Sequence, residues 1–373
     1  MVRTVAGEKY ENTKYLEILW TLEGSILDNV VSKMVMTVII SIIASFVHGQ
    51  GMAMKIPSVA YSLAGAAISF LLVFRSNISY QRFWEGRGHL GTIMMHGRDL
   101  ARQSAFNIEG DSDGQIRMNI HRYVLVYYRL MAQHVSDQIN EDPDNPGSKH
   151  PLDNLLMIKT GDKTADKKGI LTLDERTILK SKKRRPLVAI AWLTKALVEL
   201  YQEKRITHMQ YESMNQNIRG LIEGFNGVDK VHAVQVPFPY AQMLIIFLGI
   251  YCFTIPFMFV QDFGWLAVVP SCVITLAFFG INEVAIEIED PFGDDDNDLP
   301  VDKMGDALYE DLNMYMEMSG VSTKVLRQYY DHLLKQTRRE KSERKKRRAE
   351  LEQEKMNSQG AVAPVGGGSD ARP

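Results

Sequence analysis

The sequence has few of the residues and motifs on which catalysis depends. Only two cysteines occur in 373 residues, and no HExxH, Walker or GxSxG pattern is present. The nine histidines show none of the tight spacings typical of a metal site. We therefore expect no enzyme, and we expect Cys252 and Cys272 to behave as small apolar residues inside helices.

We expect neither a secretion signal nor a transit peptide at the beginning of the sequence. The first 20 residues carry charges throughout, at Glu8, Lys9, Glu11, Lys14 and Glu17, and contain no continuous apolar segment. The first strongly apolar residues come later, so we expect them to be part of the folded protein.

Long apolar runs are present, although the mean hydropathy of the chain is only −0.15. They form two pairs, Met34 to Val47 with Ile56 to Phe74, and Phe238 to Val260 with Trp265 to Ile281. A helix needs about 20 residues to cross a hydrocarbon core of about 30 Å, so the second and third runs are long enough. The first and fourth are short, and the first spans only if it includes Val30 and Val31 across Lys33, whose ammonium would then reach the interface.

These runs predict an all-α membrane protein with four transmembrane helices in two hairpins, residues 34–74 and 238–281. The alternative is a soluble protein that buries the same runs as core helices. Arginines follow the second run, whereas the short hairpin turns hold only Lys55 and Asp262 as charges. The positive-inside rule places the termini and the middle segment on the cytoplasmic side, or on the equivalent face of an organelle membrane.

The middle segment, residues 75–237, is predicted to be a cytoplasmic helical region. Amphipathic patterns predict helices over Ser79 to Phe106, Ile116 to Val135 and Pro186 to Tyr201. Between the last two, residues 137–185 are rich in Pro, Gly, Asp and Lys and predict a flexible insertion.

The C-terminal part begins with an acidic segment, residues 282–322. A charged helix is expected over residues 323–356, followed by a disordered tail, residues 357–373. The basic run 338–348 is interpreted as a solvated helix face, with binding to anionic lipid as the alternative.

The acidic segment contains EIEDPFGDDDNDLP, from Glu287 to Pro300. An EF-hand loop that started at Asp294 would need glycine at its sixth position and glutamate at its twelfth, but Leu299 and Gly305 stand there. The run is either a solvated acidic turn or a cation site of another kind. Just before and within it, Glu283, Glu287 and Asp290 share a helical face and are expected to pair with arginines such as Arg75 and Arg82.

Several segments carry a resemblance to a known family. They read SNISYQRFWEGRGHLG from Ser76, INEVAIEIEDPFGDDDNDLPVD from Ile281, LEILWTLEGSIL from Leu16 and VPFPYAQ from Val236. In this order they resemble the bestrophin anion channels and their bacterial and plant relatives. The resemblance covers residues from about 15 to about 330 apart from the insertion, and it makes residues 1–33 an N-terminal amphipathic segment. It implies a homopentamer of four-span subunits around one central pore.

The resemblance also assigns the pore residues. It places a hydrophobic neck at Ala66, Phe70 and Phe74, which are spaced by four and so stack on one helical face. A second constriction, at the cytoplasmic end, falls on Ile246. Without the resemblance, Phe70 and Phe74 are equally well explained as lipid-facing or helix-packing residues.

A calcium clasp follows PFG in animal members of the family. The resemblance places Asp295 and Asp298 at the matching side chains, with Asp294 beside them, and makes Ca²⁺ the one cofactor to expect. The N-terminal segment near Tyr10 to Tyr15 would complete the site.

The function implied is passive passage of chloride, with bicarbonate as a second ion, through a multi-pass membrane protein. The expected partners are small anions, the lipid bilayer and further copies of the chain, with no nucleic acid, and the plasma membrane is favoured over an organelle membrane. Two alternatives stay open. One is a monovalent cation channel of the same fold, and the other is a non-conducting scaffold that recruits partners through its charged C-terminal helix.

Overall fold

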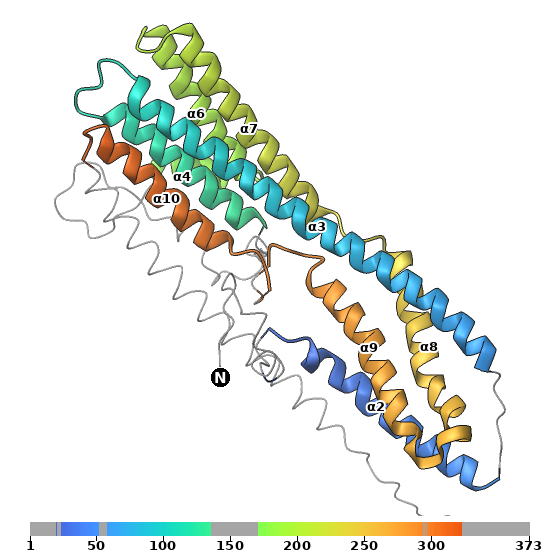
Figure 1. Cartoon of the computed structure of the whole chain (residues 1–373). Coiled ribbons are helices and arrows are strands. Elements are labelled where there is room, and N and C mark those ends of the chain that lie inside the picture. Colours follow the sequence, from blue (N-terminus) through green and yellow to red (C-terminus); the bar gives the residue numbers. More distant parts are fainter. Residues whose placement is uncertain are drawn as a thin grey trace, which may run out of the picture. The chain divides into compact units, whose positions relative to one another are not determined.

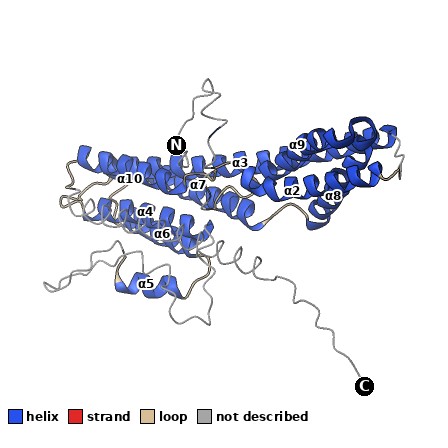
Figure 2. Cartoon of the chain, turned by 90° about the horizontal axis from the view of Figure 1, so that it is seen from below, coloured by secondary structure: helices blue, strands red, loops and turns tan. Residues whose placement is uncertain are grey.

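The computed structural model describes residue 20 and residues 24–51, 58–135, 171–293, 295 and 297–322. The chain divides into two units, one made of residues 1–140 and 184–319 and the other of residues 141–183 and 320–373. The described elements of both units are helices (Figure 2). The predicted all-α fold is thereby confirmed.

The membrane part belongs to the first unit. Its helices are α2 (Leu27–Gly49), the first half of α3 (Ser58–Asn107), α8 (Phe238–Phe263) and α9 (Val268–Glu287). Three continuous helical stretches among the described residues are long and apolar enough to span a membrane, and the third, Phe238–Glu287, contains both α8 and α9. These two helices pack side by side (Figure 1). The predicted four membrane helices are therefore confirmed. Of the two predicted hairpins, α8 and α9 pack on each other, whereas α2 packs mainly on α8 and α9, and the division into two hairpins stays a prediction.

The turn between α8 and α9 is a short 3₁₀ helix, η3 (Gly264–Ala267). Gly264 begins it with φ of +55°, a left-handed conformation that glycine adopts without steric cost. This residue lets the chain reverse within four residues, so that α9 returns alongside α8.

The first membrane helix is longer than its apolar run. It begins at Leu27 and has 23 residues, and Val30 lies fully buried inside the bundle. Lys33 does not extend to an interface alone, because its ammonium lies 3.4 Å from the carboxylate of Glu283 on α9. An ion pair between α2 and α9 thus balances the charge of Lys33, which interrupts the apolar run in the sequence.

Apolar side chains fill the centre of the membrane part. One cluster joins all four helices and contains Val30, Ile68, Leu72, Leu244, Leu248, Cys252 and Phe279. Cys252 is fully buried there, as expected, and both cysteines are free. Buried hydroxyls of Thr37 and Thr275 lie 3.1 Å apart and link α2 to α9, a contact typical of helices packed in lipid.

The rest of this unit, outside the membrane part, is a second helix bundle. We name it the cytoplasmic bundle after the predicted side of the membrane, which stays a prediction. It consists of the second half of α3 with α4 (Gln115–Val135), α6 (Arg185–Gln202), α7 (His208–Ala233) and α10 (Val301–Met318). Figure 1 shows α3 as one uninterrupted helix that runs along both parts. The predicted amphipathic helices correspond to α3, α4 and α6, whereas α7 and α10 were not predicted.

The packing of α3 on α7 depends on glycine. A Cβ added to Gly220 would lie 2.1 Å from the ring of His96, and one added to Gly227 would lie 2.2 Å from the ring of His89. The two imidazoles of α3 therefore occupy the space that side chains on α7 would take. His89 and His96 are packing residues, which agrees with the absence of a metal motif.

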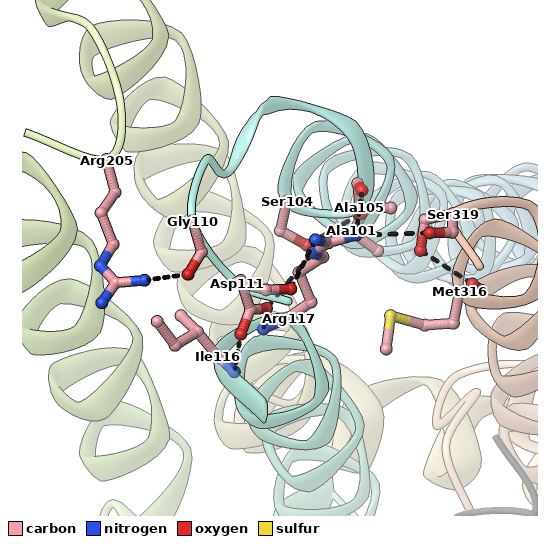
Figure 3. A network of polar contacts seen from close by, with 10 residues as sticks. All are labelled: Ala101, Ser104, Ala105, Gly110, Asp111, Ile116, Arg117, Arg205, Met316 and Ser319. Atoms are coloured by element: carbon pink, nitrogen blue, oxygen red, sulfur yellow. Dashed lines mark hydrogen bonds and ion pairs between the residues drawn. The ribbon is translucent and has the colours of Figure 1, made fainter. Parts of the chain in front are cut away.

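Polar contacts tie three helix ends together at the turn between α3 and α4 (Figure 3). The buried carboxylate of Asp111 accepts hydrogen bonds from the backbone N–H groups of Ile116 and Arg117, at 3.2 and 3.0 Å. The guanidinium of Arg117 donates to the carbonyls of Ala105 and Ser319, each at 3.4 Å. These carbonyls lie near the ends of α3 and α10, where helices leave acceptors unsatisfied.

The described part of the second unit contains α5 (Leu173–Lys180). Thr172 and Glu175 form a reciprocal capping box at its beginning, which explains why a helix starts here. The predicted insertion over 137–185 thus contains a helix that the sequence reading did not indicate, its flexibility stays a prediction, and residues 136–170 lie outside the described residues. The expected helix over 323–356 and tail over 357–373 also lie outside them, as do residues 1–19 of the N-terminal segment.

Candidate conduction pathway

The predicted neck residues lie on one exposed face of α3. Phe70 and Phe74 are 69% and 52% exposed, and Ala66 is exposed as well. The two phenyl rings stack with their centroids 6.4 Å apart. The structure thus brings the three side chains onto the face that the spacing indicated.

The opposite face of α3 is buried. Ile68, Leu72 and Arg75 are at most 6% exposed and pack against the other membrane helices. Packing within the subunit therefore does not explain Phe70 and Phe74. Their face is left for lipid, for another subunit or for a pore.

Ile246 lies on α8, about two turns after the helix begins at Phe238. It is 49% exposed, whereas its neighbours Leu244 and Leu248 are buried in the cluster of the membrane part. It comes from another helix than the neck residues and lies in a membrane span rather than in the cytoplasmic bundle. Its assignment to a cytoplasmic constriction stays a prediction.

Two tyrosines hold α8 against α3. The hydroxyl of Tyr240 donates to the carbonyl of Leu71 at 2.9 Å. A Cβ added to Gly65 would lie 2.6 Å from the hydroxyl oxygen of Tyr251, so glycine is required for this close approach. Both contacts support the half of α3 that carries Phe70 and Phe74.

A buried ion pair anchors α3 at Arg75, the residue after Phe74. The guanidinium of Arg75 donates to the amide oxygen of Asn282 at 2.9 Å and lies 3.5 Å from the carboxylate of Glu289. The same carboxylate accepts the backbone N–H of Val236 at 3.0 Å. Glu289 therefore connects α3, the end of α9 and the linker between α7 and α8. We name the contacts among Arg75, Asn282 and Glu289 the arginine latch.

A second arginine extends the same connection. Arg82 donates to the carbonyls of Glu289 at 3.0 Å and Val231 at 2.8 Å, and also to that of Val234.

Our prediction that Glu283, Glu287 and Asp290 pair with Arg75 and Arg82 is wrong in its choice of acid. Glu283 pairs with Lys33, and Glu287 accepts a hydrogen bond from Asn297 at 3.3 Å. Glu289 lies outside the helical face read from the sequence because α9 ends at Glu287.

The acidic loop after α9 folds around one buried carboxylate. Asp298 is 6% exposed and accepts a hydrogen bond from the backbone N–H of Asp295 at 2.6 Å. Burial raises the pKa of the Asp298 carboxyl to about 7, and the hydrogen bond from Asp295 opposes this shift. Asn297 donates to the carbonyl of Gly24 at 3.0 Å, which joins the loop to the chain before α2.

These contacts do not assemble a calcium site from the described residues. Within that part of the chain no three acidic, histidine or cysteine side chains group as metal ligands. The Asp298 carboxylate accepts a hydrogen bond from the backbone N–H of Asp295, and the calcium site stays a prediction. Asp294 lies outside the described residues, as does the N-terminal segment that was to complete the site.

The arginines farther along α3 are engaged in ion pairs. Arg98 lies 2.5 Å from Asp311 on α10, and Arg102 lies 2.5 Å from Asp99. Although partial burial opposes it, hydrogen bonds from Asn217, Arg102 and Gln103 hold the pKa of the Asp99 carboxyl below its usual range. The charges of these arginines are therefore largely balanced within the bundle.

Comparison with known proteins agrees with this geometry. A family model described as bacterial/fungal bestrophin protein matches residues 8–314. A voltage-dependent anion channel-forming protein from Nostoc is 24% identical over 82% of this chain and 92% of its own length. YneE of Escherichia coli, with the same description, is 23% identical over 84% of this chain and 95% of its own. A solved structure of a bacterial bestrophin homologue from Klebsiella pneumoniae superimposes with a TM-score of 0.66 at 22% identity, covering 78% of this chain and 99% of the homologue. The match over most of its length shows that the chain belongs to the bacterial and fungal bestrophin family.

Proposed function

We propose that this chain is one subunit of a homopentameric channel that passes monovalent anions passively, chloride first and bicarbonate second. The observation that carries the proposal is the exposed face of α3 with Phe70 and Phe74, in a chain whose relatives are named as anion channel-forming proteins. The channel is proposed to use no chemical reaction, so the helices need only enclose a path and shape its narrowest part.

The exposed face calls for further subunits. One helix face cannot enclose a pore, so a pore lined by Phe70 and Phe74 needs the same face of further copies. A closed ring of identical subunits supplies it, because each copy contributes the same face to a shared axis. Five copies would stack rings of Ala66, Phe70 and Phe74 along this axis.

Such rings suit the passage of anions. The edge of an aromatic ring carries positive potential, and it can face an ion that has lost part of its hydration shell. A narrow apolar constriction also gates by dewetting, since it excludes water until it widens slightly. Phe70 and Phe74 therefore serve both permeation and gating in the proposed channel.

Planar bilayers test the proposal. Purified wild-type protein should conduct, and its reversal potential in a salt gradient should lie toward the equilibrium potential of chloride. Replacing both Phe70 and Phe74 by alanine should widen the neck and raise single-channel conductance. Phe46→Ala is the matched control, because Phe46 is similarly exposed, at 59%, but lies on α2.

Three results would contradict the proposal in different ways. A wild-type protein that is silent at every voltage would favour the scaffold. A reversal potential near that of the cation would favour a cation channel of the same fold. A particle whose mass in detergent corresponds to one chain, measured by light scattering, would exclude a shared pore altogether.

A further inference from the structure

Glu85 continues the face of α3 that carries the proposed neck. It lies 11 residues after Phe74, which is about three helical turns, so the two side chains point in nearly the same direction. The axial separation is about 16 Å at 1.5 Å per residue. Gln81 and Gly88, one turn before and after, are exposed as Glu85 is. The face thus changes from aromatic to polar and acidic as α3 leaves the membrane.

Two contacts on the buried side of α3, about 100° around the helix from Phe74 and Glu85, fix this orientation. Arg75 is held by the arginine latch, and Gly86 is buried under Phe292, whose ring would lie 2.9 Å from an added Cβ. Arg75 and Gly86 are also 11 residues apart, so both lie on the same buried face of α3. Because the helix is held at both levels, Phe74 and Glu85 stay on the same exposed face.

The charge of Glu85 is not balanced by its neighbours. Within the part of the chain that the structure describes, Glu85 has neither an ion pair nor a hydrogen bond. The nearest arginine before it, Arg82, is occupied by three backbone carbonyls. Arg87 lies two residues on and therefore about 200° around the helix. Asp99, the next acid along α3, is by contrast bonded to Arg102 and Asn217.

We infer that Glu85 sets the charge selectivity of the conduction pathway, and that it acts against anions. The inference rests on the proposed function, because only a ring of subunits gathers several copies of Glu85 around one axis. Five carboxylates on the cytoplasmic side of the neck would attract cations and repel anions there. We name this part of the pathway, from the neck to the level of Glu85, the vestibule. The neck then favours anions while the vestibule opposes them, and the balance between the two decides the permeability ratio.

The size of the effect follows from distance and screening. A ring of five unit charges about 10 Å from the axis, in salt with a Debye length of about 8 Å, changes the local ion concentration about threefold. The ring raises the local sodium concentration and lowers the local chloride concentration by this factor, so neutralising it should raise the ratio of chloride to sodium permeability by the product of the two factors, about ninefold.

Reversal potentials in an asymmetric sodium chloride gradient measure this ratio. Glu85→Gln should move the reversal potential toward that of chloride, and Glu85→Lys should move it farther. Gln81→Glu adds an acid on the same face, one turn nearer the neck, and should move it toward sodium. Glu310→Gln is the matched control, because Glu310 is an exposed glutamate of α10 and its loss changes the net charge equally.

The outcomes separate this inference from the proposed function. Wild-type chloride current with a ratio unchanged by both Glu85→Gln and Gln81→Glu would overturn the role of Glu85 and leave the anion channel intact. An equal shift with Glu310→Gln would also overturn it, since the effect would then come from overall charge. A wild-type protein without current would instead refute the proposed function. If Glu85→Gln fails to assemble, Gln81→Glu alone decides by the direction of its shift.

Discussion

The arginine latch should contribute strongly to the stability of the membrane part. Arg75 is 4% exposed, and the side chain of its partner Glu289 is only 17% exposed. Removing one partner of a buried ion pair leaves the other charge without compensation, which costs about 3–5 kcal/mol. The distance of 3.5 Å and the hydrogen bond that Glu289 still accepts from the backbone N–H of Val236 indicate the lower end of this range for Arg75→Gln. We therefore expect the apparent melting temperature in detergent to fall by about 5–10 °C.

A double-mutant cycle separates the ion pair from the rest of the site. Glu289→Gln keeps an acceptor for the N–H of Val236 but removes the charge. The double variant Arg75→Gln with Glu289→Gln contains no unpaired buried charge, so it should lose less stability than the sum of the two single variants. Melting curves monitored by size-exclusion chromatography of the detergent-solubilised protein give all three values under the same conditions.

Arg98→Gln is the control for this cycle. Its ion pair with Asp311 is 2.5 Å long, but the two side chains are 39% and 36% exposed. Exposed pairs contribute at most about 1 kcal/mol, so this variant should melt close to the wild type. If Arg75→Gln falls no more than Arg98→Gln, or if the two latch variants are simply additive, the reasoning about buried charge is refuted.

Two further predictions concern the cytoplasmic bundle. Burial lowers the pKa of His121 to about 4, below its value of 6.5 in an unfolded chain, so the unfolded chain takes up the proton first as pH falls. The bundle should then lose up to about 3 kcal/mol between pH 6.5 and pH 4, and thermal melts at several pH values should show a smaller dependence for His121→Gln; an equal dependence would rule out this histidine as the cause. Gly220→Ala should destabilise the protein because its Cβ would lie 2.1 Å from the ring of His96. Gly88→Ala, whose Cβ would have open space, should leave it unchanged or raise its stability by up to about 1 kcal/mol through helix propensity. Equal melting temperatures for the two glycine variants would show that α3 and α7 tolerate a wider spacing.

The sequence predicted the membrane helices well where the signal is local. A run such as Phe238 to Val260 is apolar on all sides, and hydropathy alone identifies it. The same reasoning missed α7 and α10, whose sequences are mostly polar and whose packing depends on partners far along the chain. The glycines of α7 became informative only when His89 and His96 of α3 lay beside them.

In the candidate pathway, too, some features follow from local sequence and others depend on contacts between distant residues. A spacing of four residues places Ala66, Phe70 and Phe74 on one face from the sequence alone. The acid that pairs with Arg75 could not be read in this way. Helical spacing indicated Glu283, Glu287 and Asp290, but α9 ends before Glu289, which then reaches Arg75 from the turn that follows.

Local pattern thus determined that this chain crosses a membrane with helices and that one of them carries an aromatic stripe. It did so because hydropathy and helical periodicity are properties of neighbouring residues. Tertiary structure decided which face of α3 stays open, because this depends on the arginine latch and on Phe292 over Gly86, contacts that join residues more than 200 positions apart. The exposure of Phe74 and Glu85 is the consequence, since burial of the opposite face leaves only their side free.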